Sequence, residues 1–318
     1  MLNKILEALH KKNDYVSGEE ISQGFLISRQ ALWKYIHELR ELGYEIAAVP
    51  HLGYKLLASP DRLYSFEVKT GLDTRVMGRE IRYYETIPST MDMAMQLGMQ
   101  GAPEGLVVVS EAQSKGKGRL GRMWLSPKFK GIYFSLILRP DISPRETPIL
   151  TLMAAVSVCQ AVKNITGLDA DIKWPNDIIL NNKKTGGILT ELNAEMDKVF
   201  FVVIGIGINV NNDKKSLCEG AVSLKEYHKE SVNRVVLFRE ILKRIETNYD
   251  NFRDHGGGDI IDFWKDHNIT LGRRIKVLYQ HKTIEGEAVD IDTEGGLLLR
   301  NDSGFVERIV SGDIVHCR

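Results

Sequence analysis

The chain is poor in cysteine, and its cysteines are not spaced for disulfides or for zinc. Cys159, Cys218 and Cys317 stand far apart among 318 residues, and no Cys-x-x-Cys or His-Glu-x-x-His pattern occurs. Small secreted proteins carry an even, dense set of cysteines, and structural zinc sites use closely spaced ligands. The sequence therefore predicts a reducing, cytoplasmic location and argues against a structural zinc site.

An uninterrupted apolar run long enough to span a membrane is not expected either. The longest apolar run, residues 199–210, contains Gly205 and Gly207 and falls short of the about 20 residues that a spanning helix needs. Residues 1–4 offer neither a basic leader nor a long apolar core. We therefore expect no signal peptide and no membrane partner.

Neither sign of charge is in excess, because 42 Lys and Arg residues balance 42 Asp and Glu residues. Nucleic-acid binding would have to come from a local basic patch rather than from the overall charge. The apolar fraction of 43% and the charged fraction of 26% are typical of a folded protein, and the length allows two or three domains.

What the sequence does contain is a basic, glycine-rich loop. Residues 115–124 hold four cations and three glycines and end at Trp124. Glycines allow close backbone approach and positive φ, cations neutralise phosphate or carboxylate, and an indole offers a flat face for stacking. We expect this basic loop to close on an anion and, when empty, to be mobile because its charges repel one another.

Common phosphate-binding motifs do not explain this loop. Gly116-x-Gly118-x-x-Gly121 has the spacing of a dinucleotide site, but such a site opens into a helix, whereas the β-rich run 132–138 follows here. A P-loop needs Lys and then Ser or Thr after its last glycine, where Arg122 and Met123 stand. A solvated basic loop without a ligand stays as the alternative.

Residues 1 to about 58 predict three helices followed by a hairpin. Ser17-Gly18-Glu19-Glu20 is a capping box for a short second helix, and Ser28 caps a third. Two short strands are expected at residues 43–46 and 53–57. This order and spacing are those of a winged helix-turn-helix domain.

The third helix has an apolar face for the core and a polar face whose side chains suit base edges and phosphates. The DNA-binding candidates are Ser28, Arg29, Gln30, Trp33, Lys34 and His37. The alternative is a helical protein-interaction domain with a solvated charged face.

After Ser59-Pro60 the pattern changes to strands that alternate with longer helices. Residues 150–164 predict a buried helix and residues 237–249 an amphipathic one, and from about residue 270 short strands predict a small SH3-like barrel. We therefore predict an α+β protein with a winged helix-turn-helix in residues 1–60, a mixed α/β domain in residues 61–269 and an SH3-like β-barrel in residues 270–318.

Three further motifs share the central region with the basic loop. They are Ile87-Pro88-Ser89-Thr90-Met91-Asp92, Lys173-Trp174-Pro175-Asn176-Asp177 and Lys183-Lys184-Thr185-Gly186-Gly187-Ile188-Leu189, and residues 205–210 add Gly-Ile-Gly-Ile-Asn-Val. Together they resemble the signature set of biotin protein ligases. With the winged helix in front, the chain resembles over essentially its whole length the bifunctional ligases that are also biotin operon repressors.

The resemblance implies a two-step reaction in residues 61–269. The biotin carboxylate attacks the α-phosphate of ATP to give biotinyl-AMP and pyrophosphate, and a lysine of the biotin carboxyl carrier protein of acetyl-CoA carboxylase then attacks the mixed anhydride. ATP and Mg²⁺ are implied as co-substrates and biotin as the substrate, with no tightly bound cofactor. The first step brings anion to anion, which explains a site dense in Lys and Arg.

The resemblance also carries site roles onto numbered positions. The biotin-binding set is Ser89, Thr90, Met91, Gln113, Gly116, Lys117, Gly118, Arg119 and Lys184, of which Arg119 and Lys184 are also the catalytic candidates. The ATP-binding set is Arg122, Trp124, Asn176, Asp177 and Asn209, with Asp177 as the candidate Mg²⁺ ligand.

Two positions depart from the family pattern. Met91 stands where a polar side chain is usual, and Lys117 replaces an arginine, so it keeps the charge and loses the planar fork. Structural roles compete at other positions: Ser89-Thr90 would serve equally as a helix cap, and Trp174-Pro175 as core packing.

The family further implies operator DNA as a partner and a homodimer when the adenylate is bound. Ordering of the basic loop would exclude water and build a dimer surface, so that two winged helices reach two half-sites. Three alternatives stay open: a lipoate ligase, a ligand-sensing repressor without catalysis, and a ligase whose N-terminal domain contacts protein.

Overall fold

The computed structural model describes residues 1–12, 14–279, 282–310 and 312–316, so Cys317 lies outside the described residues. The chain forms two compact units, Met1–Arg62 and Leu63–Arg318. The second unit contains both the central α/β region and the C-terminal strands, because residues of both regions belong to one continuous hydrophobic core.

The N-terminal unit is a winged helix-turn-helix. Its elements are α1 (Leu2–Lys11), α2 (Gly18–Gly24), α3 (Arg29–Glu41), β1 (Glu45–Val49) and β2 (Gly53–Ala58). The Oγ of Ser28 accepts the Ala31 amide at 3.1 Å and so caps α3 as predicted. Leu32, Ile36 and Leu39 are buried, which places the predicted apolar face of α3 in the core.

The capping box expected at the start of α2 is replaced by a simpler cap. Ser17 Oγ accepts the amide of Glu19 at 3.2 Å. Glu20, which should return to the Ser17 backbone, instead pairs with Lys12 at 2.6 Å. A lysine from outside the helix competes for that carboxylate, and a pattern confined to four consecutive residues could not reveal it.

The second unit is built on a mixed sheet whose seven described strands follow the order β3-β4-β5-β9-β8-β7-β6. The strands are β3 (Ile81–Tyr84), β4 (Val107–Ser110), β5 (Ile132–Leu138), β6 (Asp171–Lys173), β7 (Asp177–Leu180), β8 (Lys183–Ala194) and β9 (Val199–Ile208). β3 and β4 are parallel, and every other neighbouring pair is antiparallel.

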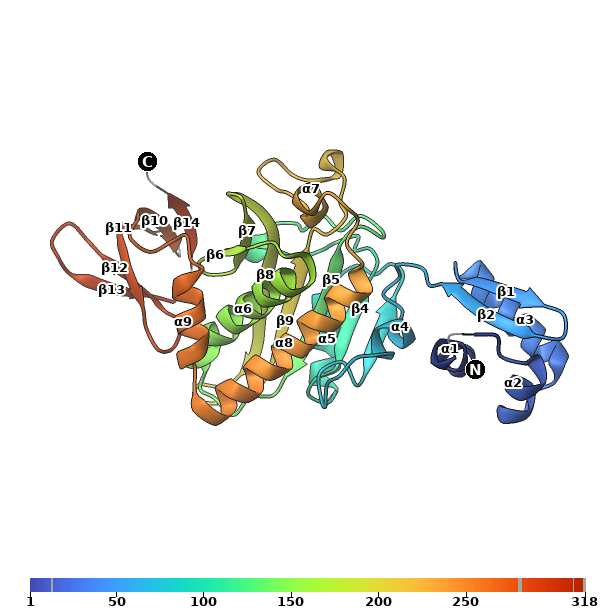
Figure 1. The fold of residues 1–318 in the computed structure, drawn as a ribbon. Coiled ribbons are helices and arrows are strands. Elements are labelled where there is room, and N and C mark those ends of the chain that lie inside the picture. The colour runs from blue at the N-terminus through green and yellow to red at the C-terminus, as the bar shows by residue number, and fades with distance from the viewer. Residues whose placement is uncertain (13, 280–281, 311, 317–318) are drawn as a thin grey trace. The chain divides into compact units, whose positions relative to one another are not determined.

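Helices cover both faces of this sheet (Figure 1). On one face, α6 (Thr147–Thr166) and α8 (Arg234–His255) pack together over a core that includes Val107 and Val109. On the other face, α5 (Thr90–Met99) packs over Val108. Successive strand residues point to opposite faces, which is why a continuous apolar run serves both cores. Shorter helices complete the unit: α4 (Ser65–Lys69), α7 (Leu224–His228) and α9 (Gly258–Asp266).

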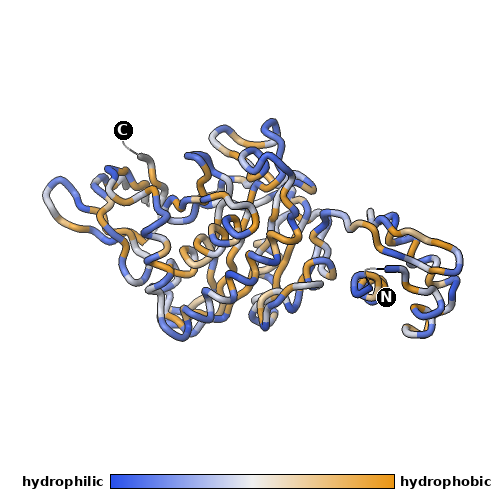
Figure 2. Tube along the Cα trace, viewed as in Figure 1, coloured by the Kyte–Doolittle hydropathy of each residue, from blue (hydrophilic) through white to orange (hydrophobic). Residues whose placement is uncertain are grey.

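Both long helices expected from periodicity are present. Residues 150–164 lie within α6 and residues 237–249 within α8, and polar and apolar residues alternate along α8 (Figure 2). The segment Pro144–Thr166 is long and apolar enough to cross a membrane, but 67% of its apolar window is buried inside the protein. It is the central helix of the domain core.

The described C-terminal strands form an antiparallel sheet in the order β13-β12-β11-β10-β14. They are β10 (Arg274–Tyr279), β11 (Lys282–Ile291), β12 (Leu297–Arg300), β13 (Val306–Ile309) and β14 (Asp313–His316). Gly295 has φ of 86° in the β11–β12 turn, where a left-handed backbone favours glycine. The predicted α+β class, with this small SH3-like β domain, is confirmed.

Candidate functional site

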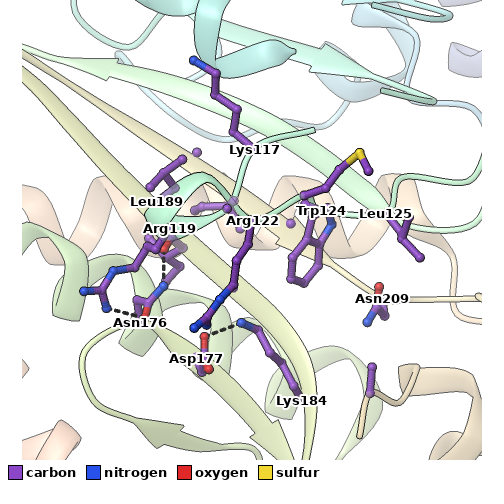
Figure 3. Close-up of a pocket in the computed structure, with 18 of the residues that line it drawn as sticks. Lys117, Arg119, Arg122, Trp124, Leu125, Asn176, Asp177, Lys184, Leu189 and Asn209 are labelled. Carbon is purple, nitrogen blue, oxygen red and sulfur yellow. Dashed lines mark hydrogen bonds and ion pairs between the residues drawn. The ribbon is translucent and has the colours of Figure 1, made fainter. Parts of the chain in front are cut away.

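A cavity of about 250 Å³ lies where α5, the basic loop and strands β7, β8 and β9 come together (Figure 3). Its walls contain every residue that the resemblance assigned to biotin or ATP except Ser89 and Gly116. The predicted residues among its walls are Thr90, Met91, Gln113, Lys117, Gly118, Arg119, Arg122, Trp124, Asn176, Asp177, Lys184 and Asn209. The fold thus gathers motifs that are far apart in the sequence.

One part of the cavity is lined by neutral hydrogen-bonding groups. Gln113 Oε1 accepts the amide of Thr90 at 2.8 Å and its hydroxyl at 3.1 Å. Gln113 Nε2 donates to Ser126 Oγ at 3.0 Å, and Ser135 Oγ donates to Thr90 Oγ1 at 3.0 Å. This connected network fixes donors and acceptors without any charge, which suits a neutral polar ligand head.

The start of α5 resolves two questions raised by the sequence. Ser89 is the N-cap of α5, since its Oγ accepts the Asp92 amide at 3.3 Å, so the helix-cap role is confirmed. Met91 is 3% exposed and lines the cavity, and a Cβ built on Gly205 would lie 3.3 Å from its Cε. Met91 therefore supplies an apolar wall where a polar side chain is usual.

The basic loop uses its glycines differently from our expectation. Positive φ occurs at Leu120 (54°) and Gly121 (72°), whereas Gly118 has φ of −121° and Gly116 also lies outside the positive region. The expectation is therefore wrong for these two glycines. Gly116 is required for close approach, because a Cβ there would lie 2.5 Å from the carbonyl oxygen of Trp124.

Lys117 points away from the other cations of the cavity (Figure 3). Its ammonium group pairs with Asp92 on α5, and this hydrogen bond raises the pKa of Lys117 even though desolvation opposes the rise. The contact ties the basic loop to α5.

Three other cations lie at the neighbouring residues Asn176 and Asp177. Arg119 Nη1 donates to Asn176 Oδ1 at 3.1 Å, and Lys184 Nζ lies 2.5 Å from Asp177 Oδ1. Arg122 extends toward Asp177 (Figure 3). This excess of positive charge is suited to phosphate or carboxylate groups of a ligand.

Asp177 is a carboxylate of the cavity wall that could ligate a metal arriving with a ligand. Among the described residues, no group of three or more His, Cys, Asp or Glu side chains could hold a metal ion. Mg²⁺ retains several waters when it binds nucleotide and uses only one or two carboxylates. Asp177 meets that need once its pairing with Lys184 is exchanged.

Trp124 packs against two strands at positions that must be glycine. A Cβ on Gly207 would lie 2.5 Å from Trp124 Cε2, and one on Gly187 would lie 3.1 Å from Cζ3. Lys184 Nζ is 5.6 Å from the ring centroid. The glycines of β8 and β9 therefore make room for the indole in the cavity wall.

The motif at residues 173–177 serves both packing and the cavity. Trp174 is 2% exposed, and it donates from its amide to Thr270 Oγ1 at 3.0 Å and from Nε1 to the Gly295 carbonyl at 3.2 Å. The packing role considered for Trp174 is thus confirmed, while Asn176 and Asp177 face the cavity.

Lys183, beside the cavity residue Lys184, does not line the cavity. Its Nζ lies 3.9 Å from Glu226 Oε1.

Sequence reasoning missed several residues that line the cavity or support its walls. Ser126 and Ser135 complete the Gln113 network, Leu189 forms an apolar wall, and residues 217–221 contribute another part of the wall. Ser135 carried a usable signal, because a serine in the middle of a buried strand needs a partner. Residues 217–221 have no periodicity or motif that would mark them.

In the N-terminal unit, all the DNA-binding candidates are exposed. Trp33 is 60% exposed and stacks on His37, with 5.6 Å between the ring centroids. Arg29 pairs with Glu19 on α2 at 3.0 Å. The polar face of α3 is therefore accessible along the predicted surface.

Comparison with known families divides the chain into three matches. The model of the biotin/lipoate A/B protein ligase family matches residues 83–209, an HTH domain model matches residues 1–55, and a biotin protein ligase C-terminal domain model matches residues 270–317. The three matches lie in the same order as the winged helix, the α/β region and the C-terminal strands.

Individual relatives match over nearly the full length. The bifunctional ligase/repressor BirA of Bacillus subtilis is 42% identical, covering 95% of this chain and 94% of the relative. BirA of Escherichia coli is 27% identical, and the match covers 97% of this chain and 95% of the relative. Among solved structures, the biotin protein ligase of Aquifex aeolicus in complex with biotin and ATP is 30% identical, with a TM-score of 0.64, and covers 76% of this chain and 99% of that one.

Proposed function

The chain belongs to the biotin protein ligase family, with the domain set of the bifunctional ligase/repressors, and on this premise we propose that its cavity joins biotin to ATP and couples that reaction to DNA binding. The protein is an ATP-dependent biotin protein ligase and a repressor. The observation that carries the site assignment is the presence of a neutral hydrogen-bonding network and a cationic cluster in one cavity.

In the first half-reaction, the neutral network binds the ureido ring of biotin. Thr90 and Gln113 supply the polar contacts, and Met91 packs against the apolar part of the ligand. Arg119 and Lys184 neutralise the carboxylate and the α-phosphate as they approach, so that the carboxylate oxygen forms a bond to phosphorus and pyrophosphate leaves. The protein supplies orientation and charge, and no protein nucleophile is required.

The nucleotide occupies the part of the cavity that is lined by the residues assigned to ATP. Trp124 and Asn209 lie on the adenine side and Arg122 and Asn176 on the phosphate side. Asp177 would hold the Mg²⁺ that accompanies ATP, which would shield the phosphate charge. The basic loop orders over both ligands and excludes water that would hydrolyse the mixed anhydride.

In the second half-reaction, a lysine of the biotin carboxyl carrier protein attacks the acyl carbon of biotinyl-AMP. The new amide bond forms as AMP leaves with the anhydride electrons, and the lysine loses a proton. Arg119 and Lys184 stabilise the departing phosphate charge.

The N-terminal unit binds operator DNA through α3. Ser28, Arg29, Gln30, Trp33, Lys34 and His37 form the contact surface. A homodimer that forms when the adenylate is bound brings two such helices to two half-sites, which raises operator affinity through effective concentration. A repressor must meet the chromosome, so the proposal places the protein in the cytoplasm.

A direct experiment tests the catalytic part. The purified chain is incubated with biotin, MgATP and a carrier domain, and the product is examined for biotin on the acceptor lysine. Biotin-dependent exchange of pyrophosphate into ATP is measured beside lipoate-dependent exchange. Labelling with biotin supports the assignment. Exchange with lipoate alone identifies a lipoate ligase, and operator binding without either activity identifies a non-catalytic sensor.

A further inference from the structure

A fully buried ion pair lies at the base of the basic loop and takes no part in the chemistry described above. Glu111 Oε2 accepts from Arg234 Nη1 at 2.7 Å, and both side chains have 0% exposure. Such pairs add little net stability, because desolvation of two charges offsets their attraction and apolar replacements are often as stable. Stability alone therefore does not account for this pair.

The pair joins the two ends, or stems, of the connection between β4 and β5, residues 111–131, which contains the basic loop. Glu111 directly follows β4, and its carbonyl accepts the amide of Phe129, in the turn that precedes β5, at 3.4 Å. Arg234, the first residue of α8, also donates from Nη1 to the carbonyl of Gly131 at 3.0 Å, directly before β5. One guanidinium group thus contacts both stems of the loop.

The two stems have little freedom to move. A Cβ on Gly131 would lie 2.4 Å from Tyr133 Oη and 2.6 Å from the Ile208 carbonyl, so this stem packs tightly against β9. On the other stem, Glu111 Oε1 accepts the amide of Leu63, the first residue of the second unit, at 2.8 Å. The carboxylate therefore has a defined partner on each oxygen.

Gln113, which arranges the neutral part of the cavity, stands two residues beyond Glu111. Its side chain binds Thr90 on one side and Ser126, on the returning arm of the loop, on the other. The position of the Gln113 amide group thus depends on the separation of the two stems. An error of 1 Å in such a contact is enough to impair substrate positioning.

We propose that Glu111 and Arg234 are positioning residues for biotin adenylation, which hold the two stems of the basic loop so that Gln113 meets Thr90 and Ser126. This inference rests on the proposed function. Neither residue lines the cavity, and both act through Gln113 and the loop.

Three variants test the role. Glu111→Gln leaves the Arg234 charge buried without its counter-ion, whereas Glu111→Gln with Arg234→Met removes both charges. Glu246→Gln is the matched control, because Glu246 is a buried carboxylate on the same α8 that accepts amides of residues 75–77 and does not line the cavity. For each variant, the unfolding midpoint and the biotin KM and kcat of pyrophosphate exchange are measured.

The double variant should recover most of the unfolding midpoint lost in Glu111→Gln, yet keep a biotin KM raised about tenfold with a smaller change in kcat. Glu246→Gln should lower the midpoint and leave the biotin KM unchanged. A double variant with the wild-type KM, or a control with an equally raised KM, would overturn the inference. Failure of the wild-type chain to exchange pyrophosphate with biotin would instead contradict the proposed function.

Discussion

Arg119 is the side chain on which the proposed retention of the adenylate depends most. Its guanidinium group donates to Asn176 at the cationic part of the cavity. A hydrogen bond between charged groups contributes about 1.5 to 3 kcal/mol, so Arg119→Ala should shorten the lifetime of bound biotinyl-AMP about 10- to 100-fold. Release of labelled adenylate into a chase of unlabelled ligand measures this lifetime.

The exposed Arg273 provides a control, because its removal also takes away one positive charge from a position outside the cavity wall. Arg273→Ala should retain the adenylate as the wild type does. If Arg119→Ala leaves both the biotin affinity and the adenylate lifetime unchanged, the role given to the basic loop is wrong.

Gly207 tests the position of the indole. A methyl group there would overlap Trp124, and such overpacking costs about 1 to 3 kcal/mol. We expect Gly207→Ala to displace the ring and raise the KM for ATP about tenfold, equivalent to ~1.4 kcal/mol, with a smaller effect on the KM for biotin. Gly258→Ala is the control, because nothing lies within 4 Å of a Cβ at that position. An unchanged KM for ATP in Gly207→Ala would remove Trp124 from the nucleotide site.

At this scale, the sequence predicts residues that belong to motifs and misses those that do not. Thr90, Gln113 and Lys184 were identified because their neighbours resemble a family pattern, and they line the cavity. Ser135 belongs to no motif, so its only sequence signal is that a serine inside a buried strand needs a partner, which its hydrogen bond to Thr90 supplies. The partner of Lys117 was equally hidden, since Asp92 meets it only after α5 and the loop have packed.

Among the elements, α3 allows the effect of a substitution on DNA binding to be distinguished from its effect on stability. Trp33 is 60% exposed, so Trp33→Ala should change the free energy of unfolding by no more than about 0.5 kcal/mol. Loss of its base contacts should weaken operator binding about tenfold. Operator affinity is measured by titrating labelled operator DNA with the variant and the wild type, and biotinylation by the same preparations shows that the ligase part is intact. Full operator affinity in this variant would remove Trp33 from the DNA surface.

The helix α8 contributes a pH-dependent stability through Glu246. Burial raises the pKa of Glu246, but hydrogen bonds from the amides of residues 75–77 and the charge of Arg75 outweigh burial and lower the pKa below its usual value. A glutamate in the unfolded chain has a pKa of about 4.3. The stability contributed by Glu246 is therefore fully present above that pH and is lost as the pH falls through the lower pKa of the folded state.

Glu246→Gln should therefore flatten the acid side of the stability profile. Thermal unfolding midpoints of the two proteins, measured from neutral pH into the acid range, should converge as the wild-type carboxylate is protonated. A constant difference between the midpoints at every pH would show that the charge of Glu246 does not contribute.

Element prediction succeeded where local periodicity agreed with packing. The apolar residues that predict α6 are buried in the core. Ser28 caps α3 through a hydrogen bond within its own first turn. The capping box at Ser17 failed because Lys12 competes for Glu20. The strand order of the central sheet could not be predicted from local sequence patterns, because β5 pairs with β9, which is far from it in the chain.

For the whole molecule, the two compact units predict separable activities. Deletion of residues 1–58 should abolish operator binding and leave biotinylation largely intact, because the cavity is lined entirely by residues of the second unit. Operator binding in an electrophoretic assay and biotin transfer to a carrier domain test both halves. Sequence-specific DNA binding that survives the deletion would refute the assignment of the N-terminal unit.

The amide of Leu63 limits where the chain can be cut between the two units. It is the first residue of the second unit, and it fills one oxygen of the buried Glu111 carboxylate. A truncated chain that begins upstream of Leu63 keeps this donor, whereas one that begins just downstream of Leu63 loses it and leaves a buried carboxylate oxygen without its hydrogen bond. The second unit can therefore be separated with this carboxylate oxygen still satisfied only by a cut upstream of Leu63.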